Sequence, residues 1–316
     1  MSAPERPHLG FLGIGLMGRP MTLRLLDAGY RVAVWNRSRD KLAGVVARGA
    51  LEKGSAAEVA RDCDLLMLCL TDQQAVCEVL LGPAGVLEGA RPGLVVVDFS
   101  SIAPPVARDI AQRFLQAGVG FVDAPVSGGT VGAEKGTLAI MAGGATSSVE
   151  AARPVLAHLA ARLTHMGGPG AGQVTKLANQ LIVAQLFPVL AEAIRLAEAG
   201  GVDGTRLPEA LRGGFADSIP LQVFGPRMAT RAWSPALGTT AVMLKDLRNV
   251  LALADAGGLE LPLARAALER YEELEQAGRA AEEPSAFIDL ITAPTATGST
   301  QPAAKLREID PPPRTS

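Results

Sequence analysis

The stretch GFLGIGLMG, residues 10–18, decides the fold of the first half of this chain. It places three glycines in the spacing G-x-G-x-x-G, after an apolar run at 8–12 and before a helical pattern at 19–29. This strand–turn–helix context is the one that binds a dinucleotide pyrophosphate. We expect Gly13 to form a tight turn, Gly15 to let the backbone approach the phosphates, and Gly18 to pack helix against strand. The predicted cofactor-binding turn is therefore Gly13, Ile14, Gly15, Leu16, Met17 and Gly18.

Short apolar runs alternate with helical patterns over the rest of this half. We predict strands at 8–12, 31–35, 64–70, 94–99, 121–124 and 137–143, with helices between them, such as 19–29 and 105–117. The runs LLMLCL (65–70) and LVVV (94–97) are continuously apolar, as strands covered on both faces should be. The pattern predicts an α/β fold in which residues 1–168 form a Rossmann domain with a doubly wound parallel sheet.

The pattern becomes helical after residue 168. We predict an all-α C-terminal domain over 169–291, which begins with a long linking helix at 173–198 and continues with helices at 207–213, 220–229, 237–256 and 263–277. Pro188 lies inside the linking helix, where it should remove one hydrogen bond and kink the helix near Ala184. Residues 292–316 contain five prolines and are predicted to be a disordered tail.

Composition excludes several classes of protein. Of 316 residues, 48% are hydrophobic and 20% charged, which is typical of a soluble globular protein. A net charge of −2 and an aromatic content of 4% argue against nucleic acid as a partner. We find no run of about 18 apolar residues for a membrane helix and no signal-peptide cleavage site, so we expect a cytoplasmic protein. Cys63, Cys69 and Cys77 fit no metal pattern and are predicted to be reduced, buried thiols; no metal site is expected.

The end of the second predicted strand bears on the choice of cofactor. NAD-binding domains carry an acidic residue there for the ribose 2′-hydroxyl, whereas this chain has Asn36, Arg37 and Ser38. Arg37 can pair with a 2′-phosphate in bidentate fashion and Ser38 can add a hydrogen bond, so NADP(H) is favoured and NAD(H) remains possible. The alternative is a surface arginine in an ordinary turn.

Two later segments are candidates for chemistry. Ser127, Gly128 and Gly129 offer a hydroxyl and unobstructed backbone amides, which suit a carboxylate but also suit a plain turn. Lys176 and Asn179 lie on one face of the linking helix, near its start. The helix dipole there should lower the pKa of Lys176, as a general acid requires, although a solvated lysine is the alternative. Lys245 is a weaker candidate.

Five stretches together resemble the β-hydroxyacid dehydrogenase family, the group of 3-hydroxyisobutyrate dehydrogenases and 2-hydroxy-3-oxopropionate (tartronate semialdehyde) reductases related to 6-phosphogluconate dehydrogenase. They are GFLGIGLMGRPM (10–21), VVVDFSSIAP (95–104), DAPVSGG with GTLAIMAGG (123–144), GAGQVTKLANQ (170–180) and MLKDL (243–247). A sixth, LRGGFADS (211–218), is most similar to the 2-hydroxy-3-oxopropionate reductase branch.

The resemblance implies a helical C-terminal domain that forms a homodimer or homotetramer, and a small carboxylate substrate. It implies that Lys176 protonates the carbonyl oxygen as hydride leaves the nicotinamide, and that Asn179 orients the substrate. The substrate carboxylate would lie on Ser127, Gly128 and Gly129. Lys245 would lie near both cofactor and substrate, and the dinucleotide would be flanked by Leu70, Thr71 and Ser101.

The function expected from these residues is the interconversion of a small 3-hydroxy acid and its semialdehyde, as in 2-hydroxy-3-oxopropionate reductase. Alternatives within the class are 3-hydroxyisobutyrate, succinic semialdehyde and glyoxylate. An imine reductase would ordinarily replace Lys176. A noncatalytic NADP-binding module is the alternative from another class, and the retention of four site residues opposes it: Ser127, Lys176, Asn179 and Lys245. Three features depart from the family pattern. Pro188 lies in a helix that is usually uninterrupted, residues 238–240 (GTT) before Lys245 are small, and Arg37 favours NADP(H) although many relatives prefer NAD(H).

Overall fold

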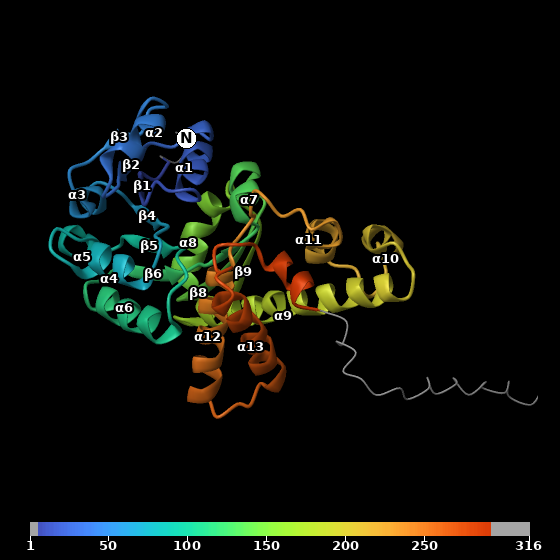
Figure 1. The fold of residues 1–316 in the computed structure, drawn as a ribbon. Helices are drawn as coiled ribbons and strands as arrows, with labels where there is room; N and C mark the ends of the chain where they lie inside the picture. Colours follow the sequence, from blue (N-terminus) through green and yellow to red (C-terminus); the bar gives the residue numbers. More distant parts are fainter. Residues whose placement is uncertain (1–5, 292–316) are drawn as a thin grey trace, which may run out of the picture. The chain divides into compact units, whose positions relative to one another are not determined.

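The computed structural model describes residues 6–291 (Figure 1). Its contacts divide the chain into two compact units. The first unit contains the chain up to Gln185 together with Ala241–Glu273, and the second contains Leu186–Thr240 together with the chain from Leu274 onward. Residue 168 therefore marks the change from strands to helices, but it is not the boundary of the first unit. That unit also includes the helical residues up to Gln185 and the helical segment Ala241–Glu273. The predicted tail at 292–316 lies outside the described residues.

The first unit is built on a mixed sheet with a parallel centre. Its order is β3-β2-β1-β4-β5-β6-β8-β7, and β9 pairs with β8. The strands from β3 to β6 are parallel, whereas β8 runs antiparallel to both β6 and β7. The α/β, Rossmann-like prediction is confirmed. The bounds are β1 (Leu9–Leu12), β2 (Val32–Trp35), β3 (Leu51–Glu52), β4 (Leu65–Leu68), β5 (Val95–Asp98), β6 (Gly120–Asp123), β7 (Val126–Ser127), β8 (Leu138–Gly144) and β9 (Ala160–Gly167).

Helices cover both faces of this sheet. Leu65 and Met67 of β4 belong to one apolar core, and Leu66 and Leu68 belong to another, because successive side chains point to opposite faces. This arrangement explains the continuously apolar run in β4. The first core includes α1 (Gly18–Asp27), α2 (Ala43–Val46), α7 (Gly129–Lys135) and α8 (Thr146–Leu156), and the second includes α3 (Ala56–Arg61), α4 (Gln73–Leu81), α5 (Val86–Gly89) and α6 (Pro104–Gln116).

The helices that follow begin and end within three residues of the predicted ones. Three strands were not predicted, because β3 and β7 have only two residues each and β9 has an exposed, mixed sequence without an apolar run. Short 3-10 turns, η1 (Arg39–Leu42), η2 (Gly204–Arg206) and η3 (Pro284–Leu290), complete the described elements. The helices are α9 (Ala171–Ala199), α10 (Leu207–Leu211), α11 (Ile219–Thr230), α12 (Thr240–Ala256) and α13 (Pro262–Gln276).

Helix α9 runs without interruption through Pro188. Proline has no backbone N–H, so the carbonyl of Ala184 lacks its helical donor. The buried hydroxyl of Tyr271 in α13 donates to that carbonyl at 3.1 Å and takes the place of the missing bond. The expected loss at Ala184 is thus compensated from outside the helix.

Among the described residues, α9 alone has the length and apolar composition of a membrane-crossing helix, and a third of that stretch is buried. No such segment was predicted from the sequence because Lys176 and several polar residues interrupt the apolar run. The amino end of α9 is bonded to two strands of the first unit, as described below, which fits a helix of the folded core.

Candidate functional site

The glycine-rich turn connects β1 to α1. Gly13 has φ +88°, and a Cβ atom there would lie 2.3 Å from the carbonyl oxygen of Cys69. A Cβ on Gly18 would lie 1.9 Å from the carbonyl oxygen of Gly13, so helix and turn can approach only with glycine at both positions. Gly15 has no neighbour within 4 Å of its Cβ position. The backbone at Gly15 is therefore open to a ligand, which is what a dinucleotide-binding turn requires.

Asn36 ties this turn to the end of β2. Its side-chain oxygen accepts a hydrogen bond from the backbone N–H of Ile14 at 2.9 Å, and its Nδ2 donates to the carbonyl of Ser38 at 2.8 Å. Both ends of the amide are thus bonded within the protein. Asn36 holds the glycine turn and the segment after β2 in one arrangement.

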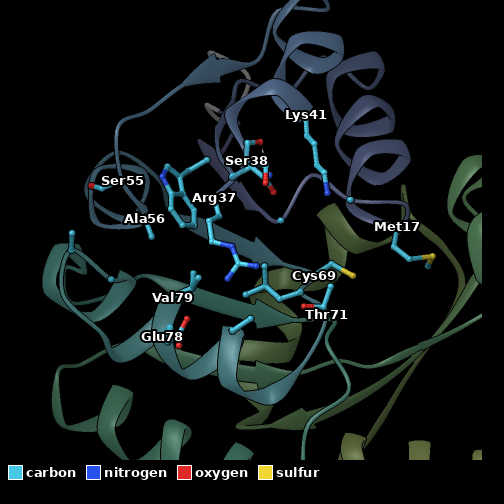
Figure 2. A pocket seen from close by; sticks show the side chains of 18 of the residues that line it. Met17, Arg37, Ser38, Lys41, Ser55, Ala56, Cys69, Thr71, Glu78 and Val79 are labelled. Atoms are coloured by element: carbon cyan, nitrogen blue, oxygen red, sulfur yellow. Dashed lines mark hydrogen bonds between the residues drawn. The ribbon is translucent and has the colours of Figure 1, made fainter. Parts of the chain in front are cut away.

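A cavity of about 700 Å³ opens along the carboxyl ends of β1, β2 and β4 (Figure 2). Figure 2 shows the Arg37 side chain reaching over Val79 and Glu78 of α4, and the amine of Lys41 pointing into the same space. Within residues 6–291, no carboxylate bonds to either cation. Nine predicted cofactor residues line this cavity: Gly13, Gly15, Leu16, Met17, Asn36, Arg37, Ser38, Leu70 and Thr71.

Four predicted cofactor residues do not line the cavity. Ile14 and Gly18 are buried in the turn, and Ser101 and Lys245 lie elsewhere. Sequence reasoning missed Lys41, which lies in η1, four residues after Arg37. The available signal was a second cationic residue shortly after Arg37 in the segment that follows β2.

The three cysteines are free thiols. Cys63 is buried, whereas Cys69 and Cys77 are only half-buried. Burial raises the pKa of Cys63 and of Cys69 to about 12, so both remain protonated at neutral pH. In the described part of the chain, no group of three or more His, Cys, Asp or Glu side chains could hold a metal ion.

The amino end of α9 is anchored to the carboxyl ends of β5 and β6. The buried carboxylate of Asp123 accepts hydrogen bonds from the backbone N–H groups of Gly170 at 2.7 Å and Gln173 at 2.9 Å. The Gln173 side chain donates to the carbonyl of Ser100 at 2.8 Å and accepts from the N–H of Ile102 at 3.2 Å. These contacts span 47 to 73 residues of sequence, and neither Asp123 nor Gln173 was predicted to have a role in the site.

Asp98 lies beside this anchor, opposite Asp123 in the register of β5 and β6. Its Oδ1 accepts from the N–H of Ser100 at 2.8 Å, and the Ser100 hydroxyl accepts from the N–H of Leu70 at 2.9 Å. The Oδ2 atom is buried without a partner. Burial raises the pKa of Asp98 to about 7 and that of Asp123 to about 6. Leu70 lines the cofactor cavity, so Asp98 supports that wall from behind.

Lys176 lies in the second turn of α9, against the short strand β7. Its Nζ donates to the carbonyl of Val126 at 3.0 Å, directly before Ser127. Gly128 and Gly129 have φ values of +125° and +60°, which favour glycine. Burial lowers the pKa of Lys176, the charge of Lys245 lowers it further, and Asp246 opposes both. The direction agrees with the prediction, and burial is the largest cause.

A chain of side-chain contacts links the remaining site residues. Asn179 donates to the side-chain oxygen of Gln180 at 2.8 Å, and Gln180 donates to Asp246 at 2.7 Å. Asp246 also lies 3.3 Å from the amine of Lys245, which is about half exposed. Two lysines and one carboxylate leave this region positively charged. That balance suits an anionic substrate. The charges of Lys245 and Asp246 act on Lys176, whose amine bonds to Val126 beside Ser127.

Comparisons with known proteins agree with this fold. Residues 8–168 match the family model described as the NAD binding domain of 6-phosphogluconate dehydrogenase, and residues 170–291 match the model described as NAD-binding of NADP-dependent 3-hydroxyisobutyrate dehydrogenase. A parallel sheet with an open glycine turn after its first strand is typical of a nicotinamide-dependent oxidoreductase. The chain belongs to the β-hydroxyacid dehydrogenase family.

Three similar proteins represent that family. The 2-hydroxy-3-oxopropionate reductase of Escherichia coli is 38% identical over 80% of this chain and 86% of its own length. The NAD-dependent L-serine dehydrogenase of Pseudomonas aeruginosa is 35% identical over 86% of this chain and 94% of its own length. The structure of Mycobacterium tuberculosis 3-hydroxyisobutyrate dehydrogenase with L-serine has a TM-score of 0.81 at 31% identity and covers 92% of this chain and 100% of that one.

Membership in this family defines the general activity. The protein is an NAD(P)-dependent oxidoreductase that acts on the CH–OH group of β-hydroxy acids. The glycine turn and the cavity fit a nicotinamide dinucleotide, because the backbone at Gly15 is open where a pyrophosphate must approach.

Proposed function

We propose that the protein is an NADP(H)-preferring reductase that converts the semialdehyde of a small 3-hydroxy acid to the alcohol, and also catalyses the reverse reaction. Its substrate would be of the 2-hydroxy-3-oxopropionate type. The observation that carries this proposal is the half-buried Lys176, whose Nζ lies 3.0 Å from the carbonyl of Val126, one residue before Ser127.

In this proposal Lys176 is the general acid for reduction and the general base for oxidation. A lowered pKa makes its ammonium proton easier to donate to a developing alkoxide near neutral pH. The nicotinamide, when bound, supplies the hydride to the carbonyl carbon or accepts it from the alcohol carbon. The carbonyl of Val126 holds the ammonium in place until a substrate oxygen offers a second acceptor.

The rest of the site would bind and orient the substrate. The hydroxyl of Ser127 and the backbone amides of Gly128 and Gly129 would hold its carboxylate, and Lys245 would add positive charge. Asn179 would hydrogen-bond the substrate while Gln180 fixes its amide from the other side. These groups recognise the acid end, so they favour small 3-oxo acids as a class.

The test is a spectrophotometric assay at 340 nm. NADPH and NADH are supplied with 2-hydroxy-3-oxopropionate, methylmalonate semialdehyde, succinic semialdehyde and glyoxylate, and 3-hydroxyisobutyrate is assayed in the oxidative direction. We expect turnover with at least one of them, and a loss of kcat of about 10²- to 10⁴-fold in Lys176→Ala. Lys135→Ala, in α7, serves as the matched control and should retain activity. Activity that persists in Lys176→Ala would refute the proposed role of this lysine.

The preference for NADP(H) is proposed from the cations of the cavity. Arg37 and Lys41 both face it, and Ser38 lines it, so a 2′-phosphate would meet two positive charges. We expect Arg37→Asp to raise KM for NADPH far more than KM for NADH. An equal change for both cofactors would show that Arg37 does not bind the phosphate.

L-Serine is a second candidate substrate. A relative named as an L-serine dehydrogenase is 35% identical, and a structure 31% identical to this chain is described with L-serine. Serine is itself a small 3-hydroxy acid, so the same carboxylate-binding groups would serve it. Oxidation of L-serine faster than that of every other alcohol tested would favour this candidate over the first.

We also infer that the protein works in the cytoplasm as a homo-oligomer formed through its C-terminal helices. The second unit presents several apolar side chains to solvent, which is costly for a monomer. Light scattering of the purified protein tests this inference, and a strictly monomeric mass would overturn it. The exposed side chains are Leu196, Val202, Phe215 and Ile219.

A further inference from the structure

A second hollow lies at the amino ends of β1 and β2, whereas the cofactor cavity lies at their carboxyl ends. It has a volume of about 400 Å³ and lies beside the edge strand β3. Leu9 and Ala33 are the buried apolar residues in its wall. Its charged and polar lining consists of His8, Arg31, Lys53, Arg61, Asp62 and Arg91.

The register of the sheet explains why this lining is concentrated on one face. Ala33 pairs with Leu51 in the parallel ladder, so Arg31 and Lys53, two residues before and after, point to the same face. Helix α3 packs on β1 and β2 and ends at Arg61, which places Arg61 and Asp62 at the margin of that face. The hollow is the part of the sheet that this six-residue helix leaves uncovered.

The cations of this hollow outnumber its carboxylates. Lys53 bonds to Asp62 at 2.5 Å, and Arg91 bonds to Asp64 at 2.7 Å, so these two cations are neutralised. Arg31 and Arg61 have no hydrogen bond or ion pair to another side chain in the part of the chain that is described. Two unpaired guanidinium groups therefore share one concave site in a chain whose net charge is −2.

We propose that this hollow binds a phosphate dianion, either inorganic phosphate or the phosphate group of a small monoester. Two excess positive charges match a dianion, and guanidinium groups pair with phosphate oxygens in bidentate fashion. The buried side chain of Ala33 lies on the same face of the sheet as Arg31 and Lys53, so it excludes water from that side of the hollow and strengthens the attraction. The site does not overlap the cofactor cavity, and the proposal is independent of the substrate of the enzyme.

Isothermal titration calorimetry tests this site. The protein is first saturated with NADPH or NADH so that the cofactor cavity cannot take up phosphate, and it is then titrated with inorganic phosphate, glycerol phosphate or acetate at low salt. We expect binding of at least one phosphate compound and much weaker binding of acetate. Binding of glycerol phosphate alone would identify the ligand as a monoester, whereas binding of both would show that the phosphate group suffices. If neither inorganic phosphate nor glycerol phosphate gave binding heat, the proposal would be overturned.

Matched variants locate the binding. Arg31→Gln combined with Arg61→Gln should weaken phosphate affinity at least tenfold, because the double variant removes both charge-assisted guanidinium pairs. The control is Arg113→Gln, an exposed arginine of α6 paired only with Asp109. Phosphate should raise Tm for wild type and the control but not for the double variant, and the cofactor affinity of all three should be equal. A double variant that binds phosphate as wild type does would place the anion elsewhere.

Discussion

Replacing Asp98 by asparagine should stabilise the protein at alkaline pH and leave its stability nearly unchanged at acidic pH. The carboxyl is fully buried, and only Oδ1 has a partner, the backbone N–H of Ser100. Asparagine retains an acceptor for that N–H and carries no charge. The substitution therefore removes the cost of a buried carboxylate with one unpartnered oxygen, and it keeps the hydrogen bond from the N–H of Ser100.

The magnitude follows from the pKa of Asp98. Burial raises it from an ordinary value of 3.8 to about 7, and that difference corresponds to roughly 4 kcal/mol. Between pH 4 and pH 7 the folded protein holds a proton that the unfolded chain has lost, so wild-type stability decreases as pH rises through this window. The Asp98→Asn variant has no such proton. Its advantage should grow from near zero at pH 4 to a few kcal/mol at pH 8.

Urea unfolding at pH 4.5, 6 and 8 measures this advantage. The two tryptophans lie in different units, Trp35 in the first and Trp233 in the second. A Trp233→Phe background therefore makes the fluorescence report the unit that contains Asp98. Asp123, whose pKa is also raised, stays in both proteins and serves as a common background. A free-energy difference that is the same at all three pH values would refute the reasoning.

Two further predictions concern the lysine and the long helix. In the proposed mechanism, the pH at which the reduction rate falls reports the pKa of Lys176. Lys245→Met should move that pH upward and Asp246→Asn should move it downward. Shifts of the same sign would contradict the electrostatics described. Tyr271→Phe should destabilise the protein by about 1 to 3 kcal/mol in urea unfolding, since the buried carbonyl of Ala184 loses its donor, and an unchanged midpoint would show that water replaces the hydroxyl.

Local features of the site could be predicted from the sequence, whereas contacts distant in the chain could not. The glycine spacing that the turn from Gly13 to Gly18 requires is visible in six consecutive residues. Lys176 and Asn179 share a helical face by spacing alone. The bonds from Asp123 to the start of α9 join residues 47 and 50 apart, and no pattern in the sequence indicates them. Burial of Lys176 is likewise a property of packing, so the sequence pattern does not indicate this cause of its lowered pKa.

The same distinction holds for the sheet. Strands buried on both faces produce apolar runs and were predicted, but β9 is an exposed strand beside β8 and has no such run. Both β6 and β7 run antiparallel to β8, so the chain reverses direction through α7, between Ser127 and Leu138, and composition carries no information about this reversal.

The bonds of Asn36 have a consequence for changing cofactor choice. The Asn36 side chain and the backbone bond from the N–H of Gly13 to the carbonyl of Trp35 at 3.3 Å fasten the glycine turn to the end of β2. The neighbouring Arg37 and Lys41 bond to no other side chain in the described chain. Holding the turn and the nucleotide selection that we propose thus fall to different residues. If Arg37 and Lys41 select the nucleotide as proposed, substitutions there should alter selectivity with little effect on folding, so cofactor preference could change without loss of the fold.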